Sequence, residues 1–335
     1  MLIQTSSAVP HVPRSPKGKW SRRIYGLAPG FLIRRFAPVL TYHSCSRELP
    51  PSVSPVDNVP PEQLYNQLET VRKHFRFVTI DEFCRARSQR GLAAATFDDG
   101  YKSVIHDALP VFSALDIPFT VFVNNIGFEQ KTFWRHKLAF ILQNGWAHEL
   151  ECSLKQTRRI PGLSLHEYSK HPDNSSISVE AEIDKFLVHR QIKIEQTPLL
   201  FDNDRYFVAH PLVWYGNHSA SHYVLSSVSL ETQYAEIKRT RDLLQQQAVN
   251  ISSIFALPFG QTYHFNRDTL AALKALDYKF MLMNRNRLNG NQPSELEGIR
   301  IVERFSVLDD VILPQLDRAF LSNVVDRFSP RFASV

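Results

Sequence analysis

Two adjacent carboxylates stand out in the segment Thr96–Gly100, which reads Thr-Phe-Asp-Asp-Gly and follows an apolar run. Neighbouring residues at a strand end can turn their side chains in different directions. One of the two carboxylates could therefore bind a metal ion while the other takes a proton. An Asp-Asp-Gly turn also commonly ends a strand without doing any chemistry, so the motif alone leaves both interpretations open.

A pair of histidines, His218 and His222, lies in the segment His-Ser-Ala-Ser-His. On a helical turn, four-residue spacing places both imidazoles on one face, within reach of one cation. Two imidazoles and one carboxylate form a site with open positions, which suits zinc or another divalent first-row metal. In a chain with 13 histidines the pair could be an incidental surface feature. The Asp-Asp-Gly motif favours the metal site.

A third candidate element is the apolar segment Phe255–Gly260, which ends in Pro258, Phe259 and Gly260. A strand broken by Pro-Phe-Gly would expose backbone N–H groups where the strand ends. A turn with no chemical role is the default interpretation of such a short pattern.

Strands and helices alternate around these motifs. Apolar runs predict strands at residues 38–43, 92–97, 118–123, 251–257 and 278–283. Helical spacing predicts helices from Pro61, over 104–115 with an interruption at Pro110, over 230–247 and over 268–276. This alternation is typical of a parallel sheet that is closed or partly closed into a barrel. In such barrels, chemistry gathers at the carboxyl ends of the strands, which is where the motifs lie.

Two stretches fall outside this alternation. Residues 1–36 are rich in Pro, Ser and basic side chains and predict an irregular arm, so the barrel domain is expected to span residues 37–335. Residues 131–206 predict a largely helical insertion that forms a lid or a flank.

Charge is distributed unevenly along the chain. The net charge is +6, yet the first 47 residues hold eight Lys or Arg and no Asp or Glu, so the remainder carries a net charge of about −2. A nucleic-acid-binding body is therefore not expected. The arm is interpreted as a solvated tail or as a contact with an anionic membrane surface.

The three cysteines are too few for a disulfide framework and form no CxxC pair. The sequence contains no convincing signal peptide and no apolar window long enough to span a bilayer. We therefore expect a cytoplasmic protein, with peripheral membrane contact through the arm as a further option.

Taken in order, TFDDG, HSASH and a strand ending in LPFG resemble the polysaccharide deacetylase family, also called NodB-homology or carbohydrate esterase family four. The resemblance covers residues 37 to 305. It implies a distorted (β/α)7 barrel in which Asp98 is the catalytic base. By the same resemblance, Asp99, His218 and His222 bind a divalent metal, zinc first, with nickel, cobalt or iron as alternatives.

Two further features of the resemblance concern catalysis. The backbone amide of Phe259, in the turn with Pro258 and Gly260, is implied to hold the oxyanion. The early Val-Leu-Thr-Tyr-His-Ser segment resembles a circularly permuted branch typified by poly-N-acetylglucosamine deacetylases, in which this histidine is the general acid. That role maps to His43, although a lone His at a strand end is otherwise more often structural.

The chain departs from the family pattern at Ala256, where many members carry an arginine that orients the base. Another residue must then take this place. Arg304, with Arg300 behind it, is the candidate, although both residues could equally be surface charges. The chain also departs in spacing, since the 120 positions from Asp98 to His218 exceed the usual gap of the family, and this places the insertion near the substrate.

The implied activity is removal of N-acetyl groups from an amino-sugar glycan or a sugar intermediate, with release of acetate. One alternative is a catalytically degenerate carbohydrate-binding module, and another is an amidase that acts on a non-sugar amide with the same barrel. The sequence does not determine the sugar, the native metal or the oligomeric state.

Overall fold

The computed structural model describes residues 36–49, 53–54, 57–192, 194, 199–290 and 294–307, together with 312, 315 and 316. The predicted basic arm lies outside the described residues except for Phe36, which is buried in the apolar core. The proposed membrane contact of the arm therefore stays a prediction. In the described part of the chain, no helix is both long and apolar enough to cross a bilayer.

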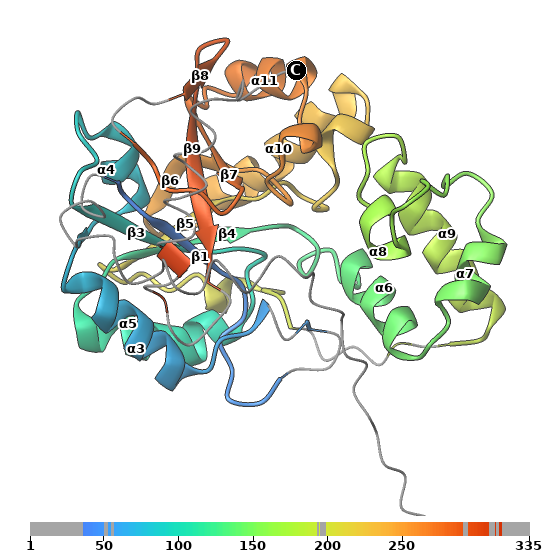
Figure 1. Cartoon of the computed structure of the whole chain (residues 1–335), viewed down its shortest axis with the longest axis horizontal. Coiled ribbons are helices and arrows are strands. Elements are labelled where there is room, and N and C mark those ends of the chain that lie inside the picture. The colour runs from blue at the N-terminus through green and yellow to red at the C-terminus, as the bar shows by residue number, and fades with distance from the viewer. Residues whose placement is uncertain are drawn as a thin grey trace, which may run out of the picture.

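Seven parallel strands form a closed ring in the order β1-β3-β4-β5-β6-β7-β9, and β9 pairs back with β1. They are β1 (Val39–Tyr42), β3 (Leu92–Phe97), β4 (Phe119–Val123), β5 (Val213–Asn217), β6 (Ile251–Ala256), β7 (Phe280–Asn284) and β9 (Ile299–Ser306). The predicted (β/α)7 barrel is confirmed. Figure 1 shows this barrel with most of the helices around it.

The strands form because their side chains are apolar on both faces, as a parallel sheet between helices requires. All four residues of β1 and all five of β4 are buried. Helices α3 (Pro61–Arg72), α4 (Ile80–Arg85), α5 (Leu109–Leu115), α10 (Leu230–Gln245) and α11 (Arg267–Ala275) accompany the barrel. Two short strands extend it: β2 (Arg76–Phe77) pairs with β3, and β8 (Ser294–Leu296) runs antiparallel to β9.

The helix predicted over residues 104–115 is divided where Pro110 interrupts it. A π-helical turn, η2 (Val104–Ala108), precedes α5, and Pro110 lies in the first turn of α5. Proline has no N–H group and its ring clashes with the preceding turn, so a regular α-helix cannot continue through it. The wider turn accommodates this defect.

Two barrel strands were not predicted from the sequence. In β5, Gly216 looks like a strand breaker, but a Cβ atom there would come within 2.4 Å of the Phe122 ring, so the glycine permits close packing of β4 and β5. In β9, the charged residues Arg300, Glu303 and Arg304 interrupt the apolar side chains, and Arg304 is itself buried. The strand therefore lacks the continuous apolar run that predicts a buried strand.

Four helices fill most of the connection between β4 and β5, and the helical character predicted for residues 131–206 is observed. They are α6 (Trp134–Gln143), α7 (Ala147–Ser153), α8 (Leu165–Tyr168) and α9 (Ser176–His189), followed by the 3₁₀ turn η3 (Asp204–Tyr206). Figure 1 shows α6 to α9 grouped on one side of the barrel. Their apolar side chains join the same large core as β3 and β4.

A buried carboxylate fixes the segment between α7 and α8. Glu182 of α9 accepts hydrogen bonds from the backbone N–H groups of Lys155, Gln156 and Thr157 at 2.5, 2.7 and 3.0 Å. The hydroxyl of Thr157 donates to it at 2.6 Å. The carboxylate thus provides hydrogen-bond acceptors for backbone N–H groups of a loop, which have no partner in a helix or a sheet.

Candidate metal and catalytic site

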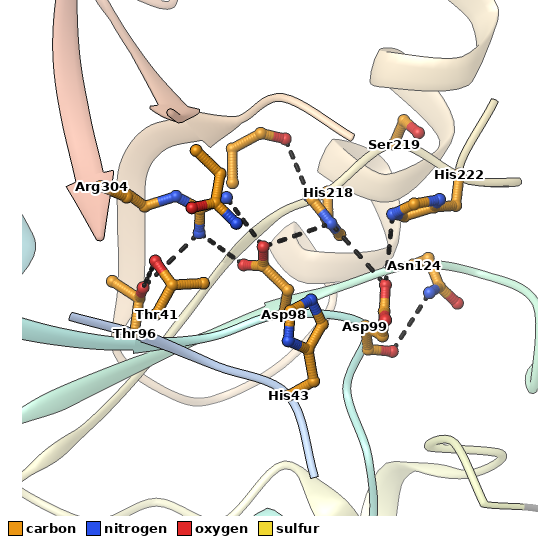
Figure 2. Close-up of polar contacts among 12 residues, drawn as sticks. Thr41, His43, Thr96, Asp98, Asp99, Asn124, His218, Ser219, His222 and Arg304 are labelled. Carbon is orange, nitrogen blue, oxygen red and sulfur yellow. Dashed lines mark hydrogen bonds and ion pairs between the residues drawn. The ribbon is translucent and has the colours of Figure 1, made fainter. Parts of the chain in front are cut away.

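The candidate residues gather at the carboxyl ends of the barrel strands, as the general rule for such barrels predicts. His43 follows β1, Asp98 and Asp99 follow β3, and His218 follows β5. Arg304 lies near the end of β9. Figure 2 shows these side chains converging on one region.

Asp99, His218 and His222 form a buried cluster whose ligating atoms all lie within 4.8 Å of one another. Nε2 of His222 is 3.4 Å from Oδ1 of Asp99, and Nε2 of His218 is 3.7 Å from the same oxygen. Two ligands that each lie about 2.0–2.1 Å from a tetrahedral zinc ion are roughly 3.4 Å apart. Oδ1 of Asp99 also has no hydrogen-bond partner. The cluster therefore fits a divalent metal ion.

The segment that carries both histidines is a loop, so the helical turn predicted for it is wrong. The chain leaves β5 at Asn217, and Ser219 and His222 adopt left-handed backbone conformations with φ of 58° and 53°. Oδ1 of Asn217 accepts from the N–H of Ser219 at 2.9 Å. Glu236 of α10 accepts from the N–H and the hydroxyl of Ser221 at 2.6 and 2.9 Å. These bonds to side chains replace the helical ones and turn both imidazoles toward Asp99.

Asp98 and Asp99 diverge because the backbone turns sharply after β3. Asp99 and Gly100 both have left-handed backbones, with φ of 70° and 71°. The amide of Asn124, which directly follows β4, donates to the carbonyl oxygen of Asp99 at 3.1 Å. Such a conformation is strained for a residue with a side chain and persists only where its surroundings hold it. As a result, Asp99 faces the imidazoles and Asp98 faces β9.

Arg304 binds both carboxylate oxygens of Asp98. Its Nη1 donates to Oδ1 at 2.6 Å and its Nη2 to Oδ2 at 2.7 Å, and both side chains are almost fully buried. Burial by itself would raise the pKa of Asp98, but the charge of Arg304, with a smaller contribution from His218, lowers it to about 2. Asp98 is therefore a carboxylate at neutral pH, and its Oδ2 lies 3.6 Å from Nε2 of His218.

Ala256 and Arg300 contribute differently. The carbonyl oxygen of Ala256 lies 2.9 Å from Nδ1 of His218, a contact that suits a metal-ligating imidazole. Arg300 lies near the other end of β9, where it donates to the carbonyl oxygen of Cys84 at 3.4 Å and packs over Phe280. Arg300 therefore lies four positions before Arg304 along the extended strand and makes its own contacts away from the cavity.

Burial decides the protonation of the three candidate ligands in the absence of a cation. It lowers the pKa of His218 to about 4 and the pKa of His222 well below its ordinary value. Burial also raises the pKa of Asp99 to about 7. Neutral imidazoles are the form that binds metals, and a bound cation would favour the ionised form of Asp99.

His43 lies beside Asp98 in Figure 2 and borders the same cavity. Its Nδ1 is 3.9 Å from Oδ1 of Asp57. Burial would lower the pKa of His43, but the carboxylates of Asp57, Asp99 and Asp98 together raise it above the ordinary histidine value. Asp57 was not found from the sequence, because it is an isolated acidic residue in a loop with no motif around it.

The turn after β6 places the ring of Phe259 against the cluster of candidate metal ligands. Phe259 and Gly260 have left-handed backbones, with φ of 61° and 71°, and a Cβ atom on Gly260 would lie 2.2 Å from the backbone nitrogen of Asn284. The N–H of Gly260 donates to the carbonyl oxygen of Pro258 at 2.7 Å. The Phe259 ring packs edge-on against His222, with centroids 4.5 Å apart. Pro258 and Gly260 thus shape the turn, and Phe259 borders the cavity.

A cavity of about 470 Å³ is bordered by the candidate ligands, by the Asp98–Arg304 pair, and by His43, Asp57 and Phe259. Its walls come from the barrel and from the insertion, which contributes Arg135, His136, His166 and Lys170. The hydroxyl of Tyr101 and Nε2 of His136 are 2.7 Å apart on one wall. Sequence reasoning placed the insertion near the substrate but did not identify these polar residues, which lie on α6, on α8 and in the turn after α8, without a recognisable motif.

Comparison with known proteins now adds to the geometry. The sequence model of the family described as polysaccharide deacetylase matches residues 205–281, which contain β5, the histidine loop and the turn after β6. Over this stretch the chain is similar to the polysaccharide deacetylase family. No curated protein matches the sequence.

Solved structures of polysaccharide deacetylases resemble this chain in fold. The Streptococcus pyogenes deacetylase PplD, solved with acetate, is 17% identical over 86% of this chain and 97% of its own, with a TM-score of 0.50. IcaB from Ammonifex degensii is 18% identical over 85% of this chain and 97% of its own, with a TM-score of 0.47. Such low identity establishes the fold alone, so the substrate and the permuted branch of the family stay predictions.

Proposed function

We propose that this protein is a metal-dependent hydrolase that removes N-acetyl groups from an amino-sugar glycan or a sugar intermediate and releases acetate. One observation carries the proposal. An ionised carboxylate, Asp98, is held by Arg304 and lies beside a ligand set that fits a divalent metal, in a cavity large enough for a sugar. The match to the sequence model of polysaccharide deacetylases supports an acetylated sugar as the substrate class.

Each residue near the cavity receives a distinct role. Asp99, His218 and His222 would hold a metal ion, which would supply Lewis acidity and lower the pKa of a bound water. Asp98 accepts the proton of the attacking water, and Arg304 keeps Asp98 ionised and oriented. His43 delivers a proton to the departing sugar nitrogen, for which its raised pKa favours the protonated form. The backbone N–H of Phe259 donates to the oxyanion.

The test is acetate release by the purified, metal-loaded chain from chitooligosaccharides and from poly-N-acetylglucosamine. We expect Asp98→Asn to lower kcat by about 10²–10⁴-fold, the usual contribution of a general base, while metal content stays unchanged. His218→Ala should lose metal and activity together. The matched control is Asp173→Asn, since the side chain of Asp173 is 72% exposed and lies in the insertion.

The remaining results distinguish the alternatives. An Asp98→Asn variant with substantial activity would remove Asp98 from the role of base. Glycan binding without acetate release from any acetylated glycan would favour a degenerate carbohydrate-binding module. Acetate release only from simple non-sugar acetamides would favour an amidase.

A further inference from the structure

Two basic side chains of the insertion converge on one wall of the cavity. Nη2 of Arg135 lies 3.0 Å from Nδ1 and 3.2 Å from Nε2 of His166. Nζ of Lys170 lies 3.0 Å from Nε2 of the same ring. Arg135, His166 and Lys170 all border the cavity that contains the candidate metal ligands. A neutral imidazole is thus the shared neighbour of two cations.

Neither cation has an acidic partner in the part of the chain that the structure describes. The other polar contact of Arg135 is with the hydroxyl of Ser169, at 3.4 Å. Lys137, on the same helix as Arg135, is different: it pairs with Glu180 at 3.4 Å and with Asp184 at 2.7 Å. The insertion therefore pairs Lys137 with two carboxylates, whereas Arg135 and Lys170 form no ion pair with a described residue and receive only the longer-range attraction of carboxylates such as Asp57.

Two neighbouring positive charges that form no ion pair are unfavourable in a partly buried wall. Burial lowers the pKa of Arg135 to about 10 and the pKa of Lys170 to about 8, and in Lys170 the nearby Arg135 adds to the effect. Burial, with the charge of Arg135, also lowers the pKa of His166 to about 3, so His166 adds no third charge at neutral pH. An anion between Arg135 and Lys170 would relieve this repulsion.

The two cations lie close to the reacting centre. The guanidinium carbon of Arg135 is 5.6 Å from the centroid of the Phe259 ring, and that ring packs against His222. The Phe259 ring therefore contacts both Arg135 and His222, a candidate metal ligand. An anionic group bound by Arg135 and an acetamide near the metal ligands could then belong to one sugar or to two adjacent sugars.

We propose that Arg135 and Lys170 form a subsite for an anionic oxygen group, phosphoryl or carboxylate, carried by the N-acetylated substrate. This inference rests on the proposed function and narrows it to acidic amino sugars or glycans. Arg135 supplies planar paired donors and Lys170 a second positive charge, which together suit an oxyanion. The neutral ring of His166 contacts both cations, and a bound anion can either contact this ring or take its place.

The first measurement compares kcat/KM for three acetylated probes: N-acetylglucosamine 6-phosphate, N-acetylmuramic acid and neutral N-acetylglucosamine. We expect the metal-loaded wild-type chain to prefer at least one acidic probe over the neutral one by tenfold or more. In the R135Q/K170Q double variant, this preference should fall to about unity. The two acidic probes distinguish a phosphoryl group from a carboxylate.

Matched controls address charge and folding. Arg159→Gln and Lys185→Gln remove one exposed positive charge each from the same insertion, away from the cavity lining. Both should keep the preference for acidic probes. Arg135→Lys retains a positive charge and should retain part of the preference, whereas a merely structural role would show as a loss of thermal stability with an unchanged ratio of acidic to neutral kcat/KM.

A binding measurement separates this inference from the proposed function. Glucosamine 6-phosphate and glucosaminuronic acid, which have no acetyl group, are titrated into metal-loaded wild type and into R135Q/K170Q by calorimetry. We expect at least tenfold weaker binding to the double variant. Equal affinities would mean that the metal alone binds the anion and would overturn the subsite. Loss of binding in the variant, with no acetate released by any form, would uphold the subsite and reject the deacetylase.

Discussion

Arg304, on the last strand of the barrel, binds both oxygens of Asp98, which follows the second strand of the ring, at 2.6 and 2.7 Å. The pair is buried, so the guanidinium compensates the carboxylate charge where water cannot. It also leaves Oδ2 of Asp98 facing His218 at 3.6 Å. The pair thus fixes both the charge and the direction of the proposed base.

Replacing Arg304 should therefore affect catalysis and stability together. Arg304→Met leaves a buried carboxylate unpaired, which raises the pKa of Asp98 and destabilises the fold by about 3–5 kcal/mol, the usual effect of breaking a buried pair. Urea unfolding and kcat measure the two effects. Arg300→Gln, on the same strand but remote from the cavity, is the control. An Arg304→Met enzyme with normal kcat would show that the base does not depend on this arginine.

Metal affinity should depend on pH through one proton. Asp99 has a pKa of about 7 before a cation binds, so below pH 7 a metal must displace its proton, and affinity should fall about tenfold per pH unit. His218, with a pKa of about 4, is already neutral in this range and does not compete. Calorimetric titration with zinc from pH 5 to pH 8 should give a slope near one that flattens above pH 7. A slope of two or more would mean that protons also compete for the imidazoles.

The pH–rate profile should report the contact between His43 and Asp57. A general acid must be protonated, so activity is lost as pH rises through the pKa of His43. The carboxylate of Asp57 raises this pKa, and Asp57→Asn should therefore move the basic limb of kcat to lower pH. His43→Ala should remove that limb and most of the activity. An unmoved limb in Asp57→Asn would assign it to another group.

The stability of the insertion should depend on Glu182. Burial would raise the pKa of Glu182, but the hydroxyl of Thr157 and three backbone N–H groups lower it below the ordinary value. A lowered carboxyl pKa contributes stability that is present at neutral pH and is lost as pH falls below the ordinary value near 4.5. Glu182→Gln should thus destabilise the chain by about 1.5–3 kcal/mol at pH 7, as loss of bonds to a charged group does.

The check is urea unfolding of Glu182→Gln and wild type at pH 7 and at pH 4, where the difference should shrink. Glu295→Gln, a change at an exposed residue of β8, serves as the control. An equal difference at both pH values would mean that shape rather than charge makes Glu182 important.

Much of the barrel could be predicted from local sequence. The segments at β1, β3, β4, β6 and β7 are short, mostly apolar runs, which are typical of strands buried on both faces. The order of the Asp-Asp-Gly, histidine and Pro-Phe-Gly motifs along alternating elements then placed the proposed chemistry at one end of the barrel. Such inferences succeed because hydrophobic periodicity and turn chemistry depend on neighbouring residues.

Only the tertiary structure decided how distant residues meet. The pairing of Arg304 with Asp98 joins positions 206 residues apart, and the loop conformation of His218 to His222 depends on Glu236 from a later helix. Arg135 and Lys170 reach the cavity because the insertion folds back over the strand ends. Local pattern carries no information about such contacts, since they are determined by the closure of the ring and by the packing of the insertion against it.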